Sequence, residues 1–130
     1  MADYLLDTHI LILALRRHAP TLDTIQRLHQ QGLLHISVVT RAEVLSGMHA
    51  HEETRTLNLL DSLNGLAVDM AIADQAGRWV YHYAPGVQLS VPDALIAATA
   101  RRHSLTLVTT NAKHFPMGDI AVHGILVSPG

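Results

Sequence analysis

The sequence predicts an α/β fold in which residues 1–130 form a single domain with a short central parallel sheet sandwiched by helices. Short aliphatic stretches typical of buried strands alternate with longer stretches whose apolar residues repeat at helical spacing. This alternation is typical of a parallel sheet covered on both faces. The length suits one hydrophobic core, and 48% of the residues are hydrophobic.

In the first half of the chain, strands are predicted where aliphatic residues run together and helices where they are spaced. Pro20 and Gly32 favour the start and the stop of one helix, and Asn64-Gly65 supplies a later stop. The elements predicted here are a strand over 4–6, helices over 9–15 and 22–28, a strand over 33–39, and helices over 40–51 and 53–64.

In the second half, two helices have clear start signals. Asp69 is expected to cap a helix that runs to Val80, and Ser90 to cap a second helix with Pro92 in its first turn. The elements predicted here are a strand over 66–68, helices over 69–80 and 90–103, a loop over 83–89, and strands over 105–108 and within 121–127.

Composition excludes several classes of protein. The chain has no cysteine, so it has neither disulfides nor thiolate metal ligands. A net charge of −2 does not fit a uniformly basic nucleic-acid-binding surface. The longest aliphatic run covers residues 10–15, which is far too short to span a membrane, and acids precede it. A soluble, untargeted, cytoplasmic protein is therefore expected.

Three carboxylates follow or precede predicted strands at matching positions. Asp7 ends the first strand, Glu43 lies in the first turn of the helix after the second strand, and Asp93 opens the helix before the fourth. In an open α/β sheet, ligands bind where strands turn into helices. The alternative is that the three acids only cap helices, since Thr40-x-x-Glu43 has the form of a capping box and Ser90-x-x-Asp93 resembles one.

Polar residues 109–111 (Thr-Thr-Asn) follow the fourth strand at a comparable position and add further oxygen atoms. Hard cations such as Mg²⁺ and Mn²⁺ prefer carboxylate, carbonyl and water oxygens. A divalent ion held there could activate water and neutralise the developing charge of a phosphodiester.

At this point the chain resembles the PIN-domain family, specifically the VapC-like toxins of bacterial toxin–antitoxin pairs. The resemblance covers nearly the whole chain, because four motifs occur in the expected order. They are residues 5–9 (LLDTH), 37–44 (SVVTRAEV), 92–100 (PDALIAATA) and 107–115 (LVTTNAKHF).

The resemblance implies that Asp7, Glu43 and Asp93 hold Mg²⁺ or Mn²⁺, and it adds Thr8 and Asn111 to the predicted catalytic residues. The fourth acid of many relatives is missing, because Asn111 and His114 occupy the two positions where it occurs. Asp119 is near in sequence but matches no motif position. A site with one fewer charge is expected to bind a second metal ion more weakly.

Other polar and aromatic residues have simpler explanations. Thr8 and Thr110 could contact metal-bound water or make ordinary loop hydrogen bonds. His49 and His51 are unsuited to share a metal ion if they lie two positions apart on a helix. The aromatic side chains in residues 79–83 could stack on bases, although packing is the expected role.

The resemblance further implies an endoribonuclease that uses water as the nucleophile and leaves 5′-phosphate and 3′-hydroxyl ends. It also implies a homodimer and a small VapB-like antitoxin partner, which is expected along the apolar segments 10–15 and 22–28 and to reach the three acids. Two alternatives stay open. One is a catalytically degenerate PIN-like module that binds RNA or protein, and the other is a nuclease that acts on DNA.

Overall fold

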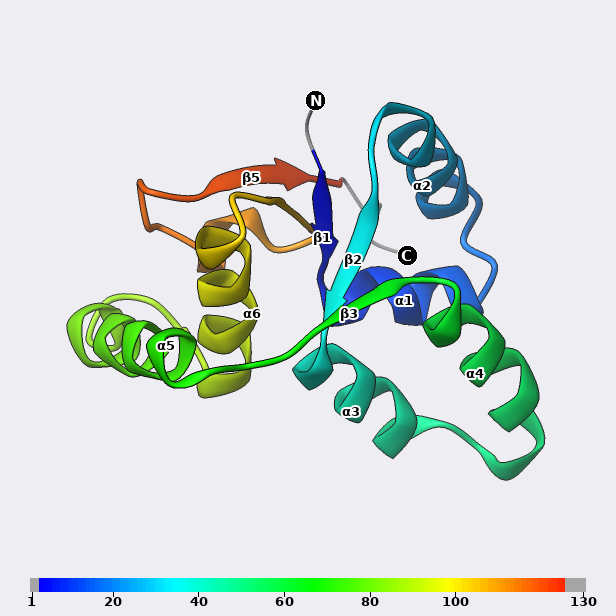
Figure 1. Cartoon of the computed structure of the whole chain (residues 1–130), viewed down its shortest axis with the longest axis horizontal. Coiled ribbons are helices and arrows are strands. Elements are labelled where there is room, and N and C mark those ends of the chain that lie inside the picture. The colour runs from blue at the N-terminus through cyan, green and yellow to red at the C-terminus, as the bar shows by residue number, and fades with distance from the viewer. Residues whose placement is uncertain (1–2, 126–130) are drawn as a thin grey trace.

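The computed structural model describes residues 3–125, which form a sheet with helices on both sides (Figure 1). The strands are β1 (Tyr4–Leu6), β2 (Leu34–Ser37), β3 (Asn64–Leu66), β4 (Thr106–Thr109) and β5 (Ala121–Gly124). The α-helices are α1 (Thr8–Leu15), α2 (Ala19–Gln31), α3 (Val38–Gly47), α4 (Glu53–Asp61), α5 (Met70–Tyr83) and α6 (Val91–Arg102), and two short 3₁₀ helices are η1 (Ala50–Glu52) and η2 (Ala112–His114).

The five strands are all parallel and lie in the order β3-β2-β1-β4-β5. The chain moves outward from β1 to β2 and β3, and then returns to the other side of β1 to form β4 and β5. The order therefore reverses between β1 and β4, and this is the position where open α/β sheets bind ligands. Leu6 of β1 pairs with Val108 of β4, so the residues that follow, Asp7 and Thr109, end neighbouring strands.

The sheet separates two hydrophobic cores because successive strand residues point to opposite faces. Leu5 and Leu107 pack with α5 and α6 on one face. Leu6 and Val108 pack on the other face with α1, α2 and α4. Figure 1 shows the same division, with α5 and α6 on one side of the strands and α1, α2 and α4 on the other. The predicted three-layer α/β fold is confirmed.

The second strand ends earlier than predicted. Ser37 caps α3, because its hydroxyl accepts a hydrogen bond from the backbone N–H of Val39 over 3.1 Å. Residues 38 and 39 therefore begin a helix, although their β-branched side chains favour a strand. Consequently Thr40 lies inside α3 and is not its cap, and the predicted capping box with Glu43 is wrong.

The third strand also differs from its prediction. It covers Asn64–Leu66 and pairs with β2, whereas the prediction placed it at residues 66–68 and used Asn64-Gly65 to end the preceding helix. This strand lies at an edge of the sheet and is mostly exposed, so its sequence lacks the aliphatic pattern of a buried strand. The helix before it ends at Asp61.

The remaining elements agree with the predictions to within a few residues. Asp69 and Ser90 cap α5 and α6 as expected. Strand β4 begins and ends one residue later than predicted, so Thr109 belongs to it. Strand β5 lies within the predicted stretch 121–127, whose last two residues are outside the described part of the chain. None of the helices within residues 3–125 has the length and apolar character that a bilayer crossing requires.

Candidate active site

Asp7 lies at the carboxyl end of β1 and is almost completely buried, with 6% of its surface exposed. Its backbone N–H donates to the carbonyl of Val108, which fixes the end of β1 against β4. One carboxylate oxygen, Oδ1, accepts a hydrogen bond from the N–H of Thr8 over 2.8 Å. The other, Oδ2, accepts from the hydroxyl of Thr109 over 2.7 Å. Asp7 therefore caps α1, as one interpretation of the sequence predicts, and its carboxylate is also held by the end of β4.

The pKa of Asp7 is raised, chiefly because burial disfavours the charged carboxylate. The hydrogen bonds from Thr109 and Thr8 oppose this change, while the negative charges of Asp93 and Glu43 add to it. These repulsions place Asp93 and Glu43 within electrostatic range of Asp7. Within residues 3–125, none of these three acids forms an ion pair with a lysine or an arginine, so no positive side chain offsets their repulsion.

Glu43 is half-buried in α3 and is held from the first strand–helix junction. The hydroxyl of Thr8 donates to its Oε1 over 2.7 Å and lies 3.0 Å from the hydroxyl of Thr40. A threonine hydroxyl carries a single proton, so Thr8 donates to the carboxylate and accepts from Thr40. Thr8 thus orients Glu43 through its side chain and Asp7 through its backbone.

Asp93 occupies the first turn of α6, where Pro92 and the cap Ser90 fix the start of the helix. The backbone N–H of Asp93 donates to the hydroxyl of Ser90 over 3.2 Å. This hydrogen bond engages only the backbone of Asp93. The half-buried carboxylate is left free to face Asp7 at the carboxyl end of the sheet.

The end of β4 contributes Thr109, and the loop after it contributes Thr110 and the predicted Asn111. The hydroxyl of Thr109 accepts from the backbone N–H of Asn111 over 3.0 Å while it donates to Asp7. The side chain of Asn111 is exposed beside this contact. The hydroxyl of Thr110 lies 2.9 Å from Nδ1 of His9, which joins the loop to α1 across the crevice between β1 and β4.

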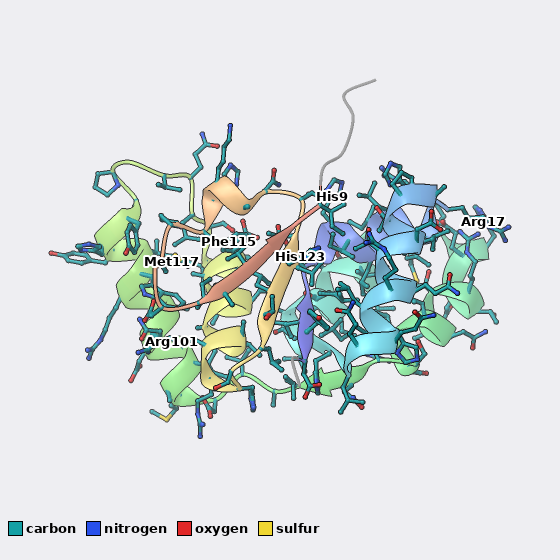
Figure 2. The ribbon with its side chains drawn as sticks, turned by 90° about the horizontal axis from the view of Figure 1, so that it is seen from above. His9, Arg17, Arg101, Phe115, Met117 and His123 are labelled. Atoms are coloured by element: carbon teal, nitrogen blue, oxygen red, sulfur yellow. The ribbon has the colours of Figure 1, made fainter. Side chains whose placement is uncertain are left out.

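Asp119 does not belong to the site. Its Oδ2 lies 2.7 Å from Nε of Arg101, near the C-terminal end of α6. Eight residues separate Arg101 from Asp93, which is a distance of about 12 Å along a helix. Figure 2 shows Arg101 well away from His9, which lies at the site end of α1. Asp119 is therefore removed as a candidate for the fourth position. His114 is half-buried at the end of η2, and its role at the fourth position stays a prediction.

Three further sequence features lie outside the site. The rings of His49 and His51 do stack, with centroids 5.8 Å apart, because His49 precedes η1 and does not share a regular helix with His51. The premise that the two residues share one helix is therefore wrong, and the prediction that they do not share a metal ion stays a prediction. Trp79 is buried in the core against the sheet, so packing is its role. Tyr81 is exposed.

The role of Thr109 was not recognised in the sequence, where it was only one of several oxygen-bearing residues after a strand. Its importance depends on the parallel register that places β4 beside β1. The contact between His9 and Thr110 likewise joins segments 101 residues apart. The only local signal for either contact was a run of hydroxyl residues at the end of a strand.

The donor set fits a hard divalent cation in chemistry and charge. Within the described residues, no three acidic or histidine side chains are gathered closely enough to form a complete metal site. Mg²⁺ does not require one, because it usually keeps several waters and binds through one or two carboxylates together with substrate phosphates. The buried carboxylate of Asp7, with the half-buried Glu43 and Asp93 that repel it, supplies that kind of partial site.

Comparison with known proteins identifies similar sequences and structures. Residues 4–117 match the PIN domain. The chain is 36% identical over 114 residues to Ribonuclease VapC10 of Mycobacterium tuberculosis, covering 87% of this chain and 86% of the relative. It is similar to a chain in a toxin–antitoxin complex from Klebsiella pneumoniae, with a TM-score of 0.79, 30% identity, and coverage of 94% and 99%. A chain of VapBC2 from Rickettsia felis, bound to a DNA fragment from its promoter, shares the fold with a TM-score of 0.79, 23% identity, and coverage of 95% and 98%.

Proposed function

The chain belongs to the PIN-domain family, and we propose that it is a toxin-like endoribonuclease that hydrolyses RNA phosphodiester bonds with Mg²⁺ or Mn²⁺. The observation that carries this proposal is the convergence of Asp7, Glu43 and Asp93 at the crevice between β1 and β4. The 36% identity to a relative named as a ribonuclease supports RNA as the substrate.

Asp7, Glu43 and Asp93 would hold the divalent cation. When bound, the cation would supply water activation and would neutralise charge on the scissile phosphate. The task of the chain is to present charged carboxylates in a fixed orientation. Thr109 and the N–H of Thr8 orient Asp7 and oppose the burial that favours its protonated form. The hydroxyl of Thr8 holds Glu43.

Asn111 replaces one negative charge with a neutral amide at the fourth position. Its backbone N–H donates to Thr109, and its exposed side chain can contact a water or the substrate. We expect Asn111→Asp to tighten divalent-metal binding, because ligand charge tunes the affinity for hard cations. A calorimetric titration with Mn²⁺ compares the two proteins. Equal or weaker binding in the variant would place Asn111 outside the site.

The test of the proposed activity is cleavage of a structured RNA with Mg²⁺, with Mn²⁺ and with a chelator. Cutting should require the cation and should be abolished in Asp7→Asn and Asp93→Asn. Asp61→Asn is the matched control, because Asp61 is exposed and forms an ion pair with Arg41 on the surface. Tight RNA binding without any cutting would instead favour the degenerate binding module. Cutting of DNA alone would overturn RNA as the substrate.

A second measurement separates a metal site from a set of helix caps. Mg²⁺ should raise the melting temperature of the wild type, because a ligand that binds only the folded state stabilises it. The same concentration should have a much smaller effect on Asp7→Asn. Equal stabilisation of both proteins would contradict a metal site at Asp7, whatever the outcome of the cleavage assay.

We further propose that a small VapB-like antitoxin neutralises this activity by occupying a cleft of about 390 Å³ beside the site. The apolar part of the cleft is formed by Ile12 and Leu15 of α1 with Val44 and Met48 near α3. Glu43 lies in the same cleft, so a bound segment could continue from apolar contacts to the acids. An arginine on that segment would match the carboxylate cluster in charge and geometry.

A further inference from the structure

The side chain of His9 connects α1 to the loop after β4 at the edge of the candidate active site. Its Nδ1 lies 2.9 Å from the hydroxyl of Thr110, although the two residues are 101 positions apart in the sequence. His9 follows Asp7 by two residues, so it stands at the same end of the sheet as the acids. His9 is exposed, whereas Thr110 is half-buried. The ring is therefore held in place beside the acids and stays accessible from solvent.

Stability of the fold does not explain a histidine at this position. A hydrogen bond between groups that water can reach adds little to folding, because water can replace either partner. His9 lies in the first turn of α1, which is capped by Asp7 and contains no acid. The partial positive charge at the start of a helix favours acidic side chains there and disfavours basic ones. A molecule that contacts the ring from outside the chain would account for both observations.

The contact with Thr110 leaves one ring nitrogen of His9 for such a molecule. Nε2 has no hydrogen-bond partner within residues 3–125. When the hydroxyl of Thr110 donates to Nδ1, the ring proton is on Nε2. Nε2 then presents a single N–H donor whose direction is fixed by the contact on the other side of the ring. Phosphate oxygens receive most of the hydrogen bonds that proteins donate to nucleic acids.

The distribution of charge around the site directs a phosphate backbone to this side. The three acids repel a polyanion, and no lysine or arginine pairs with them in the described part of the chain. Residues 110–118, by contrast, contain no acid and carry the exposed Lys113. Figure 2 shows Arg17, which follows the other end of α1, far from His9. The approach with the least repulsion therefore crosses His9 and the loop after β4.

We propose that His9 is a substrate-binding residue whose Nε2 donates to a phosphate of the RNA strand beside the scissile one. Thr110 is a positioning residue in this arrangement, because it acts only by holding the ring of His9. The inference rests on the proposed ribonuclease function and adds a contact that fixes the strand relative to the three acids. A phosphate contact carries no information about the bases, so His9 sets the position of the strand and not the choice of sequence.

Binding of short RNA oligonucleotides, measured by fluorescence anisotropy with a chelator present to prevent cutting, tests the contact. His9→Ala should weaken binding by about tenfold, which is the effect of losing one good hydrogen bond to a charged group. The loss should be equal for RNAs of different sequence, because every nucleotide has a phosphate. His9→Gln keeps an N–H donor and should retain most of the affinity. His9→Phe keeps a flat ring without a donor and should bind as weakly as His9→Ala.

His29→Ala is the matched control for removal of an exposed histidine. His29 lies in the last turn of α2, which leads into the amino end of β2 and is therefore at the opposite end of the sheet from the acids. This variant should bind RNA as the wild type does. The melting temperatures of His9→Ala and His29→Ala should both stay close to that of the wild type, because both side chains are exposed.

Two further variants test whether Thr110 acts through His9. Thr110→Val should weaken RNA binding in the wild type but cause no additional loss in His9→Ala, because residues that act as one unit are not additive. Thr110→Ser keeps the hydroxyl and should bind normally. In the cleavage assay, His9→Ala should raise KM and leave kcat nearly unchanged, since the contact is made in the bound substrate as well as in the transition state.

The binding and cleavage measurements can fail separately. A wild type that binds RNA but never cuts it would reject the proposed activity, and the anisotropy series would still decide whether His9 contacts the strand. Unchanged RNA binding in His9→Ala, a loss that depends on the RNA sequence, or full affinity in His9→Phe would overturn the phosphate contact. A wild type that does not bind RNA at any concentration would overturn it as well.

Discussion

A single hydroxyl group, that of Thr109, connects the fold to the chemistry of the site. It donates to Asp7 and accepts from the backbone of Asn111, so it fixes the most buried acid and the loop that carries the fourth position. Its hydrogen bond favours the charged form of Asp7, against the burial that raises the pKa. The carboxylate of Asp7 is therefore held ready for a cation at a cost in folding stability.

We expect Asp7→Asn to raise the free energy of unfolding at neutral pH by on the order of 1 kcal/mol. The raised pKa means that the folded state binds the proton more tightly than the unfolded chain. Charged Asp7 therefore opposes folding above its raised pKa, and this penalty disappears as the pH falls through that value. The advantage of the variant should shrink accordingly in urea unfolding at mildly acidic pH. An advantage that does not depend on pH would contradict this account.

Thr109→Val should destabilise the protein by roughly 2 kcal/mol, because it removes two hydrogen bonds and leaves the N–H of Asn111 without its partner. It should also raise the pKa of Asp7 further, since the lost hydroxyl favours the charged form. We therefore expect RNA cleavage to require a higher pH than in the wild type. Thr109→Ser keeps the hydroxyl and should retain the wild-type pH profile. An equal shift in Thr109→Ser would mean that the hydroxyl by itself does not set the pKa of Asp7.

At the scale of elements, two helices end in a conformation that their residues disfavour. Arg17 follows α1 with a φ of 57°, and Ser104 follows α6 with a φ of 55°. Both ends have the paired hydrogen bonds of a Schellman motif, in which glycine is the preferred residue. Arg17→Gly and Ser104→Gly should each stabilise the protein by about 0.5–1 kcal/mol.

Thermal or urea unfolding of the two variants measures this gain. Because the same backbone geometry occurs at both helix ends, the two substitutions should have similar effects. A loss of stability only in Arg17→Gly would mean that the arginine side chain makes a stabilising interaction that offsets its backbone strain.

The elements that could be predicted from the sequence are those that lie in the centre of the fold. Residues 4–6 are fully buried between two strands, so their aliphatic pattern is unambiguous. Strand β3 is exposed at the sheet edge, and its Asn64-Gly65 indicates a turn equally well. At residues 38 and 39, the cap at Ser37 prevails over the strand preference of two valines. The pattern of apolar residues shows neither which residue caps a helix nor which strand lies at the edge of the sheet.

At the scale of the whole molecule, the three acids could be predicted as a group from the sequence. Asp7 follows a strand, Glu43 lies in the helix after a strand, and Asp93 opens a helix. The PIN-domain assignment from four ordered motifs is confirmed. The hydrogen-bond partners of the acids could not be identified, since Thr109 reaches Asp7 only after β4 has paired with β1. Asp119 could not be excluded from the sequence either. Its partner Arg101 lies in the last turn of α6, whereas Asp93 lies in the first turn of the same helix.

The arrangement of α1 and α3 around one cleft leads to the prediction of an inhibitory partner. Apolar side chains from both helices line the cleft, and Glu43 connects it to the acids. A small VapB-like protein encoded beside this gene should therefore co-purify with the chain and suppress RNA cutting. Met48→Glu should weaken capture of that partner by more than about tenfold, because it puts a charge into an apolar contact.

Pull-down from cells that express both proteins, followed by the cleavage assay, checks this prediction. Leu33→Glu introduces the same charge at an exposed leucine that does not line the cleft, and capture should be as strong as with the wild type. High salt should weaken capture if an arginine of the partner meets Asp7, Glu43 and Asp93, because salt screens such pairs. A neighbouring protein that neither binds nor suppresses cutting would reject the toxin role and leave the nuclease activity to be judged by the RNA assay alone.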